Sequence, residues 1–143
     1  MSSTYISVAL RRQVEARAHQ RCEYCLLPAA LAFILPHEID HVIAEKHGGV
    51  TEENNLALAC WRCNRHKGTD LASFDPQTGV LTLLFNPRTQ NWRDHFVREG
   101  TVLLGVTPEG RTTVHLLQLN TAERIAERVR LMHMGPETSH LKP

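Results

Sequence analysis

The sequence lacks any long hydrophobic run. No stretch approaches the roughly 20 apolar residues needed to span a bilayer, so no membrane partner is expected. Residues 1–7 also lack the apolar core that a secretory signal peptide contains. Internal repeats and low-complexity segments are absent as well. Hydrophobic residues still make up 42% of the 143 residues. We therefore expect a soluble cytoplasmic protein with one modest core.

A strong excess of one charge is also missing. The chain carries 16 Lys and Arg against 15 Asp and Glu, which gives a formal net charge of +1 at pH 7. This balance provides no strong overall attraction to a polyanion. Any surface that binds nucleic acid must therefore be a local basic face.

Cysteine is scarce, but its four copies are regularly spaced. They form two Cys-x-x-Cys pairs, Cys22 with Cys25 and Cys60 with Cys63. This spacing lets one tight turn present two thiolates to the same ion, and zinc takes four such ligands tetrahedrally. The alternatives are two disulfides, which are rare in the cytoplasm, or four unconnected thiols. We predict one structural Zn²⁺ that contributes folding free energy.

The segment between the two pairs, 26–59, exceeds the usual interval of a zinc ribbon, so it should contain structure of its own. The β-branched residues of 38–43 predict a short strand, and 56–60 can return as a second strand. Two consecutive glycines, 48–49, indicate a loop between the strands. A helix is predicted from Asn64 to about Leu71. The predicted unit is strand–loop–strand–helix, tied down by zinc.

This unit resembles the HNH endonucleases, also called ββα-metal or His-Me finger nucleases. It is most similar to the four-cysteine branch that includes bacterial standalone HNH proteins and phage junction resolvases. The resemblance rests on Cys22, Cys25, Asp40, His41, Gly48, Gly49, Asn55, Cys60, Cys63, Asn64 and Lys67. One position departs from the common pattern: the last member of the family's triad is often His, whereas this chain has Asn64.

The chemistry expected of these residues is metal-dependent hydrolysis of a phosphodiester. His41 is the expected general base, because an imidazole ordinarily titrates near about pH 6.5. Asp40 and Asn64 would supply a carboxylate and an amide oxygen to one Mg²⁺ or Mn²⁺ ion. That ion would act as a Lewis acid on the phosphate and the leaving 3′-oxygen. The resemblance implies that Asn55 holds the loop or orients His41, and that products carry 3′-hydroxyl and 5′-phosphate ends.

Basic side chains near the motif are expected to contact DNA, because Lys and Arg suit phosphate oxygens. The candidates are Arg62, Arg65, Lys67, Arg88 and Arg93. Duplex or branched DNA is the expected partner. The sequence leaves the oligomeric state open, with a homodimer as one option.

The N-terminal flank is predicted to be helical. The helix should follow Ser7 as its N-cap and run to about Gln20, with Leu10, Val14 and Ala18 facing the core. Residues 1–74 would thus hold the nuclease core, this helix and the zinc knuckles.

Residues 75–143 are predicted to form a small α+β extension, so that the fold class is α+β overall. Strands are expected at 80–85 and 101–107, with a turn at 108–110. The segment 113–119 is compatible with either a helix or a strand, and the helix is favoured. A further helix should follow Asn120 as its cap and end near residue 134, before a disordered tail at 135–143. Ile125, Val129 and Met132 would share one face of that helix. Trp92 and Phe96, four residues apart, are expected in the core rather than stacked on nucleic-acid bases.

Two functional classes stay open at the level of sequence. The first is a metal-dependent DNA endonuclease. The second is a catalytically silent zinc-containing module that binds nucleic acid or protein. Asp40, His41 and Asn64 together favour the first class, because a pure binding module needs no such set. A toxin-type nuclease is a third option, but no feature of secretion or immunity supports it.

Overall fold

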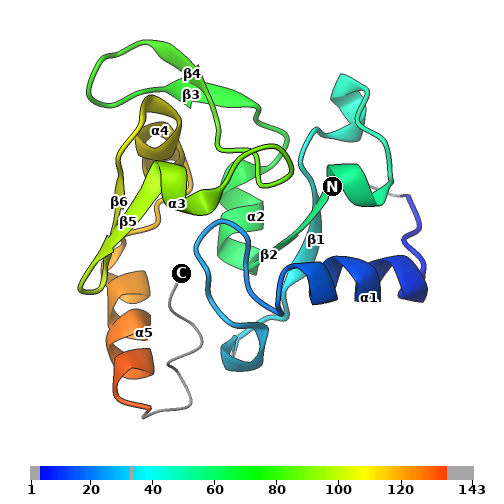
Figure 1. The fold of residues 1–143 in the computed structure, drawn as a ribbon, viewed down its shortest axis with the longest axis horizontal. Helices are drawn as coiled ribbons and strands as arrows, with labels where there is room; N and C mark the ends of the chain where they lie inside the picture. Colours follow the sequence, from blue (N-terminus) through cyan, green and yellow to red (C-terminus); the bar gives the residue numbers. More distant parts are fainter. Residues whose placement is uncertain (1–3, 33, 135–143) are drawn as a thin grey trace.

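The computed structural model describes residues 4–32 and 34–134. It contains short helices and three two-stranded antiparallel sheets (Figure 1), which confirms the predicted α+β class. The helices are α1 (Val8–Arg17), α2 (Trp61–Lys67), α3 (Trp92–His95), α4 (Pro108–Leu116) and α5 (Ala122–Met132). The strands are β1 (Glu38–His41), β2 (Leu56–Ala59), β3 (Ala72–Phe74), β4 (Leu81–Leu83), β5 (Phe96–Glu99) and β6 (Val102–Gly105). Single 3₁₀ turns occupy Ala29–Leu31, Glu45–His47 and Glu53–Asn55.

The first helix matches its predicted cap and core face. The Ser7 hydroxyl accepts a hydrogen bond from the Leu10 N–H at 3.1 Å. Val14 and Ala18 are buried, and Leu10 packs against the same small cluster, which also contains Leu56 of β2. The helix ends at Arg17, earlier than expected, and the chain then turns toward the first cysteine pair.

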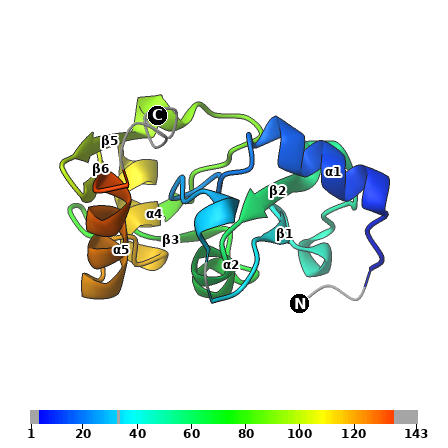
Figure 2. The same ribbon diagram turned by 90° about the horizontal axis from the view of Figure 1, so that it is seen from below.

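The β1–β2 hairpin lies between α1 and α2 (Figure 2). Its register pairs Glu38 with Ala59 and His41 with Leu56. All four residues of β2 are buried, because alternate side chains enter two different clusters. Leu56 and Leu58 face α1, whereas the alanines between and after them join the cluster that contains the cysteines.

Helix α2 begins earlier than predicted. Cys60 is the N-cap of α2, and its sulfur accepts a hydrogen bond from the Cys63 N–H at 3.4 Å. The helix therefore starts at Trp61 rather than Asn64. It ends at Lys67, because Gly68 follows with a positive φ of 52°. The predicted range of 64–71 was wrong by about one turn.

The extension contains two hairpins, β3–β4 and β5–β6. Strands β3 and β5 were not predicted, and the predicted turn at 108–110 is wrong, because α4 begins at Pro108. The Thr107 hydroxyl accepts from the Gly110 N–H at 3.0 Å, and proline at the first helical position needs no N–H partner. Gly110 permits close packing, since a Cβ there would lie 2.0 Å from the His95 carbonyl oxygen.

The last helix differs from its prediction in both cap and core face. Thr121, not Asn120, is the N-cap, and its hydroxyl accepts from the Arg124 N–H at 3.3 Å. The Asn120 amide instead bonds the N–H and carbonyl of Leu103 in β6. Val129 is 40% and Met132 57% exposed, whereas Ile125 is half-buried, so two of the three residues of the predicted apolar face are turned outward. The buried face carries two arginines, Arg124 and Arg128.

One hydrophobic cluster joins the two parts of the chain. Phe85 and Phe96 meet edge to face at 5.2 Å, and Trp92 stacks on Phe96 at 5.0 Å, which confirms that both predicted aromatics belong to the core. The same cluster includes Tyr24 and all four cysteines. The extension therefore shares its core with the predicted zinc knuckles. The tail predicted to be disordered lies outside the described residues. Within 4–32 and 34–134, no helix has the length and apolarity needed to cross a membrane.

Candidate active site and metal centre

The four cysteines converge on one point. Their sulfur atoms lie within 4.8 Å of one another, and all four residues are buried. The Cys25 and Cys60 sulfurs are 3.7 Å apart. A tetrahedral zinc site with bonds of about 2.3 Å needs an edge of about 3.8 Å, whereas a disulfide needs about 2.05 Å. All four thiols are free, so the disulfide alternative is wrong and the cluster fits one tetrahedral ion.

Each Cys-x-x-Cys turn, here called a knuckle, directs backbone N–H groups at a cysteine sulfur, which favours the thiolate form. The N–H groups of Tyr24 and Cys25 each lie 3.4 Å from the Cys22 sulfur, and the second pair repeats this contact. Burial raises the pKa of the Cys22 and Cys63 thiols well above the ordinary value. Four neighbouring thiolates therefore require a cation to be stable in this core.

His41 ends strand β1, and its ring is held by the following loop. Its Nε2 lies 2.9 Å from the Thr51 hydroxyl and 3.8 Å from a carboxylate oxygen of Glu45. Neither Thr51 nor Glu45 was singled out from the sequence. Their contacts with His41 depend on how the loop folds back, which the sequence pattern does not indicate.

Asp40 is only 4% exposed and has two polar partners. The Tyr24 hydroxyl donates to its Oδ2 at 2.8 Å, and the Lys67 ammonium lies 3.2 Å from each carboxylate oxygen. Burial raises the pKa of Asp40, and Lys67 and Tyr24 act in the opposite direction. Tyr24 was missed by sequence reasoning, although it stands inside the first Cys-x-x-Cys pair and so had to lie near the cluster.

Lys67 is 2% exposed and ties α2 to the end of β1. Besides Asp40, its ammonium donates to the carbonyls of His41 at 3.2 Å and Val42 at 3.1 Å. Asn64 is half-buried and stands one turn before Lys67, so the two side chains share a face of α2. The oxygen donors of Asp40 and Asn64 are of the type that suits a hard divalent ion. In this structure, the positive charge beside Asp40 is that of Lys67.

Asn55 fastens the loop that separates β1 from β2. Its side-chain oxygen accepts from the Ile43 N–H, and its amide donates to the Ile43 and Val50 carbonyls, each at 2.9 Å. Gly49 lies against these hydrogen-bonded groups, because a Cβ there would come within 1.6 Å of the Ile43 carbonyl oxygen. Any side chain at Gly49 would therefore displace the loop that carries Thr51.

The five candidate DNA-contact residues fall into two groups. Three of them have partners within the protein: Lys67 as above, Arg62 with Glu127 at 3.3 Å, and Arg88 with Glu23 and the Leu56 carbonyl. Two are exposed, namely Arg65, which also lies over the Trp61 ring at 5.1 Å, and Arg93. The acidic partners lie far from the arginines in the sequence, so sequence reasoning did not find these pairs.

The geometry agrees with the comparison to known proteins. Residues 22–70 match the HNH endonuclease family. The matched segment contains both cysteine pairs, β1, β2 and α2. Comparison of the chain with curated proteins and with solved structures gave no match.

Proposed function

We propose that this chain, whose residues 22–70 form an HNH domain, is a divalent-metal-dependent DNA endonuclease that hydrolyses phosphodiester bonds. The observation that supports it most is the junction of β1 and α2. There His41 ends the strand beside Asp40, and Lys67 of α2 donates to the Asp40 carboxylate and to the His41 carbonyl. Asn64 stands one turn before Lys67 on the same helix. Cleavage of plasmid DNA tests the proposal, as set out in the Discussion.

His41 is the general base of this mechanism. The Thr51 hydroxyl at 2.9 Å fixes the orientation of the ring. His41 then takes a proton from the attacking water as the water approaches the phosphorus. Glu45, 3.8 Å from the ring, favours the imidazolium that this step produces. Asn55 acts indirectly, because it holds the loop that carries both of these partners.

Asp40 and Asn64 would hold one Mg²⁺ or Mn²⁺ ion. When bound, this ion would supply Lewis-acid stabilisation of the negative charge on the phosphate and the leaving 3′-oxygen. Tyr24 and Lys67 orient the Asp40 carboxylate and counteract the effect of its burial. Lys67 thus positions a ligand rather than binding DNA.

The four cysteines would hold a structural Zn²⁺. Cys60 caps α2, and Cys63 lies in its first turn, so a bound ion would fix where the helix begins. A fixed start determines the direction in which α2 presents Asn64 and Lys67 to β1. Zinc therefore supports the catalytic arrangement without taking part in the reaction.

A second candidate is the catalytically silent zinc-containing module. The ion pair between Lys67 and Asp40 favours it, because that pair satisfies a buried carboxylate without any catalytic ion. Under this alternative, the protein binds nucleic acid or protein but leaves DNA intact in every divalent metal. His41 and Asn64 would then have no chemical role.

The two exposed candidate arginines, Arg65 on α2 and Arg93 on α3, should carry the electrostatic part of DNA binding. Arg65→Glu and Arg93→Glu are each expected to weaken binding for all DNA sequences. Each should lower the slope of log K against log salt by about 1, because one phosphate contact is lost. Fluorescence anisotropy with labelled duplex at several salt concentrations measures both quantities. Arg130→Glu makes the same charge change on the outer side of α5 and is the matched control. Equal effects of all three variants would contradict the assignment.

A further inference from the structure

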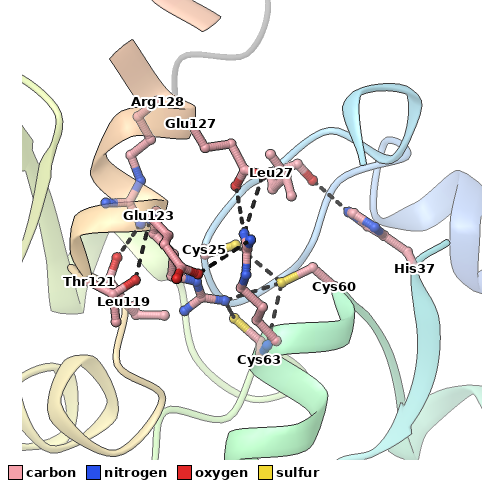
Figure 3. A network of polar contacts seen from close by, with 12 residues as sticks. Cys25, Leu27, His37, Cys60, Cys63, Leu119, Thr121, Glu123, Glu127 and Arg128 are labelled. Carbon is pink, nitrogen blue, oxygen red and sulfur yellow. Dashed lines mark hydrogen bonds and ion pairs between the residues drawn. The ribbon is translucent and has the colours of Figure 1, made fainter. Parts of the chain in front are cut away.

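The C-terminal helix reaches the cysteine cluster through one side chain. Arg124 of α5 is 3% exposed, and its Nη2 donates to the Cys60 sulfur at 3.3 Å and to the Cys63 sulfur at 3.1 Å. Figure 3 shows this region, with α5 on one side of the sulfurs of Cys25, Cys60 and Cys63. A residue far outside the HNH segment therefore contacts two of the four sulfur atoms.

The other side of the guanidinium is also satisfied. Its Nη1 donates to the carbonyls of Leu117 at 2.9 Å and Gln118 at 3.2 Å, at the C-terminal end of α4. Carbonyls at a helix C-terminus carry partial negative charge. Arg124 is thus placed between the end of α4 and the sulfurs at the start of α2.

The charges explain why an arginine is stable in this core. A buried cation without partners is strongly destabilising. Four thiolates around one Zn²⁺ leave a net charge of −2, which favours a neighbouring cation.

The helix also closes access to the cluster. A cavity of about 30 Å³ lies between α5 and the first knuckle, lined by Cys25, Leu27, Arg124 and Arg128 among others. This volume holds about one water molecule. Cys25 is only 8% exposed in this arrangement, so α5 limits access to its sulfur from this side.

We propose that Arg124 is a positioning residue of the four-cysteine metal centre, which stabilises the thiolates by charge and hydrogen bonds and links metal retention to the docking of α5. This inference rests on the proposed zinc site. Groups that bond to metal ligands typically change metal affinity about 10–100-fold when removed. The coupling is reciprocal, so loss of the metal should also weaken the docking of α5.

Arg128 provides a matched control. It lies one turn later on the same buried face of α5, but it donates to the oxygen atoms of Thr101, Leu119 and Asn120. Arg124→Met and Arg128→Met therefore each replace a buried arginine of α5 with the same uncharged side chain. They differ in the contact with sulfur.

The test compares the rates at which a chromophoric zinc chelator removes metal from the zinc-loaded full chain. Arg124→Met is expected to release zinc about 10–100-fold faster than the wild type. Arg128→Met should release zinc clearly more slowly than Arg124→Met, because it weakens the docking of α5 without removing a hydrogen bond to sulfur. Arg124→Lys, which keeps the charge but lacks the planar fork, should lie in between. Equal rates for Arg124→Met and Arg128→Met would overturn the inference.

A spectroscopic readout covers the case in which Arg124→Met does not fold. In the cobalt-loaded protein, the thiolate-to-cobalt charge-transfer band reports the electron density on sulfur. Arg124→Lys should shift this band, and Arg128→Lys should not. An unshifted band in Arg124→Lys together with wild-type release would overturn the inference. A wild-type protein that holds no zinc or cobalt would instead contradict the zinc site itself, so the two failures are distinguishable.

Discussion

His41→Ala is expected to abolish DNA cleavage while leaving the fold and DNA binding nearly intact. The imidazole acts in the chemical step, and removal of a positioned general base slows a reaction by about 10²–10⁴-fold. Within residues 4–32 and 34–134, the polar partners of the His41 ring are the loop residues Thr51 and Glu45, so the hairpin should survive its loss. Single-turnover cleavage of plasmid DNA in Mg²⁺ or Mn²⁺ measures the effect. His115→Ala, an exposed histidine on α4, is the matched control and should cut at the wild-type rate.

Recovery of cleavage at excess metal distinguishes the general base from the residues that bind the cation. Asp40→Asn and Asn64→Ala weaken the proposed ion site, so a large excess of Mg²⁺ or Mn²⁺ should partly restore cleavage. The same excess should not restore His41→Ala, because the missing group is a proton acceptor. A His41→Ala protein that cuts at the wild-type rate in the same metal would show that the assigned base is wrong.

Cys63→Ser is expected to remove the cooperative unfolding transition. Cys63 is fully buried, and it joins the first turn of α2 to the sulfur cluster. Structural zinc sites supply about 10–16 kcal/mol of apparent binding free energy at neutral pH, which is comparable to the whole stability of a small domain. Loss of the Cys63 thiolate should therefore lead to loss of both the bound metal and the tertiary structure. Metal analysis and a circular-dichroism thermal scan measure these two losses.

Metal removal provides the matching experiment on the unmodified chain. A strong zinc chelator under reducing conditions should reproduce the behaviour of Cys63→Ser, and added Zn²⁺ should reverse it. Ser73→Ala, in the β3–β4 hairpin, is the control and should retain both the bound metal and the cooperative unfolding transition. A Cys63→Ser protein that melts at the wild-type temperature without bound metal would contradict a structural role for the ion.

Local sequence patterns predicted the parts of the fold that depend on neighbours in the chain. The cap at Ser7 and the stripe of Val14 and Ala18 follow from helix periodicity, and the structure confirms them. The Cys-x-x-Cys spacing predicted the sulfur cluster, because two residues between cysteines suffice for one turn. The family resemblance was likewise carried by spacing within one segment, and the match at 22–70 confirms it.

The errors have a common physical cause, which is that distant partners decide between locally equivalent options. Asn120 and Thr121 can both cap a helix, but Leu103 of β6 engages Asn120 and leaves the cap to Thr121. The outward face of α5 was misjudged because apolar periodicity ignores buried cations. Arg124 faces inward since the cysteine sulfurs, which are remote in sequence, provide its partners.

Partners distant in the sequence also explain the errors among the candidate DNA-contact residues. Lys67 and Arg88 were counted with the DNA contacts as basic residues near the motif. The structure pairs them with Asp40 and Glu23, which no sequence spacing connects to them. Arg65 and Arg93 remain the exposed members of that set. The proposed DNA surface is correspondingly smaller than the one predicted.

The most direct test of the nuclease assignment is incubation of the zinc-loaded protein with supercoiled plasmid, with and without added metal. The account predicts nicked or linear DNA in Mg²⁺ or Mn²⁺, and intact DNA in a chelator chosen to spare the bound zinc. It also predicts 3′-hydroxyl and 5′-phosphate ends at the cuts. A folded, zinc-loaded protein that leaves the plasmid supercoiled in every divalent metal would contradict the assignment and favour the silent binding module. Equal cleavage with and without chelator would contradict the proposed role of Asp40 and Asn64.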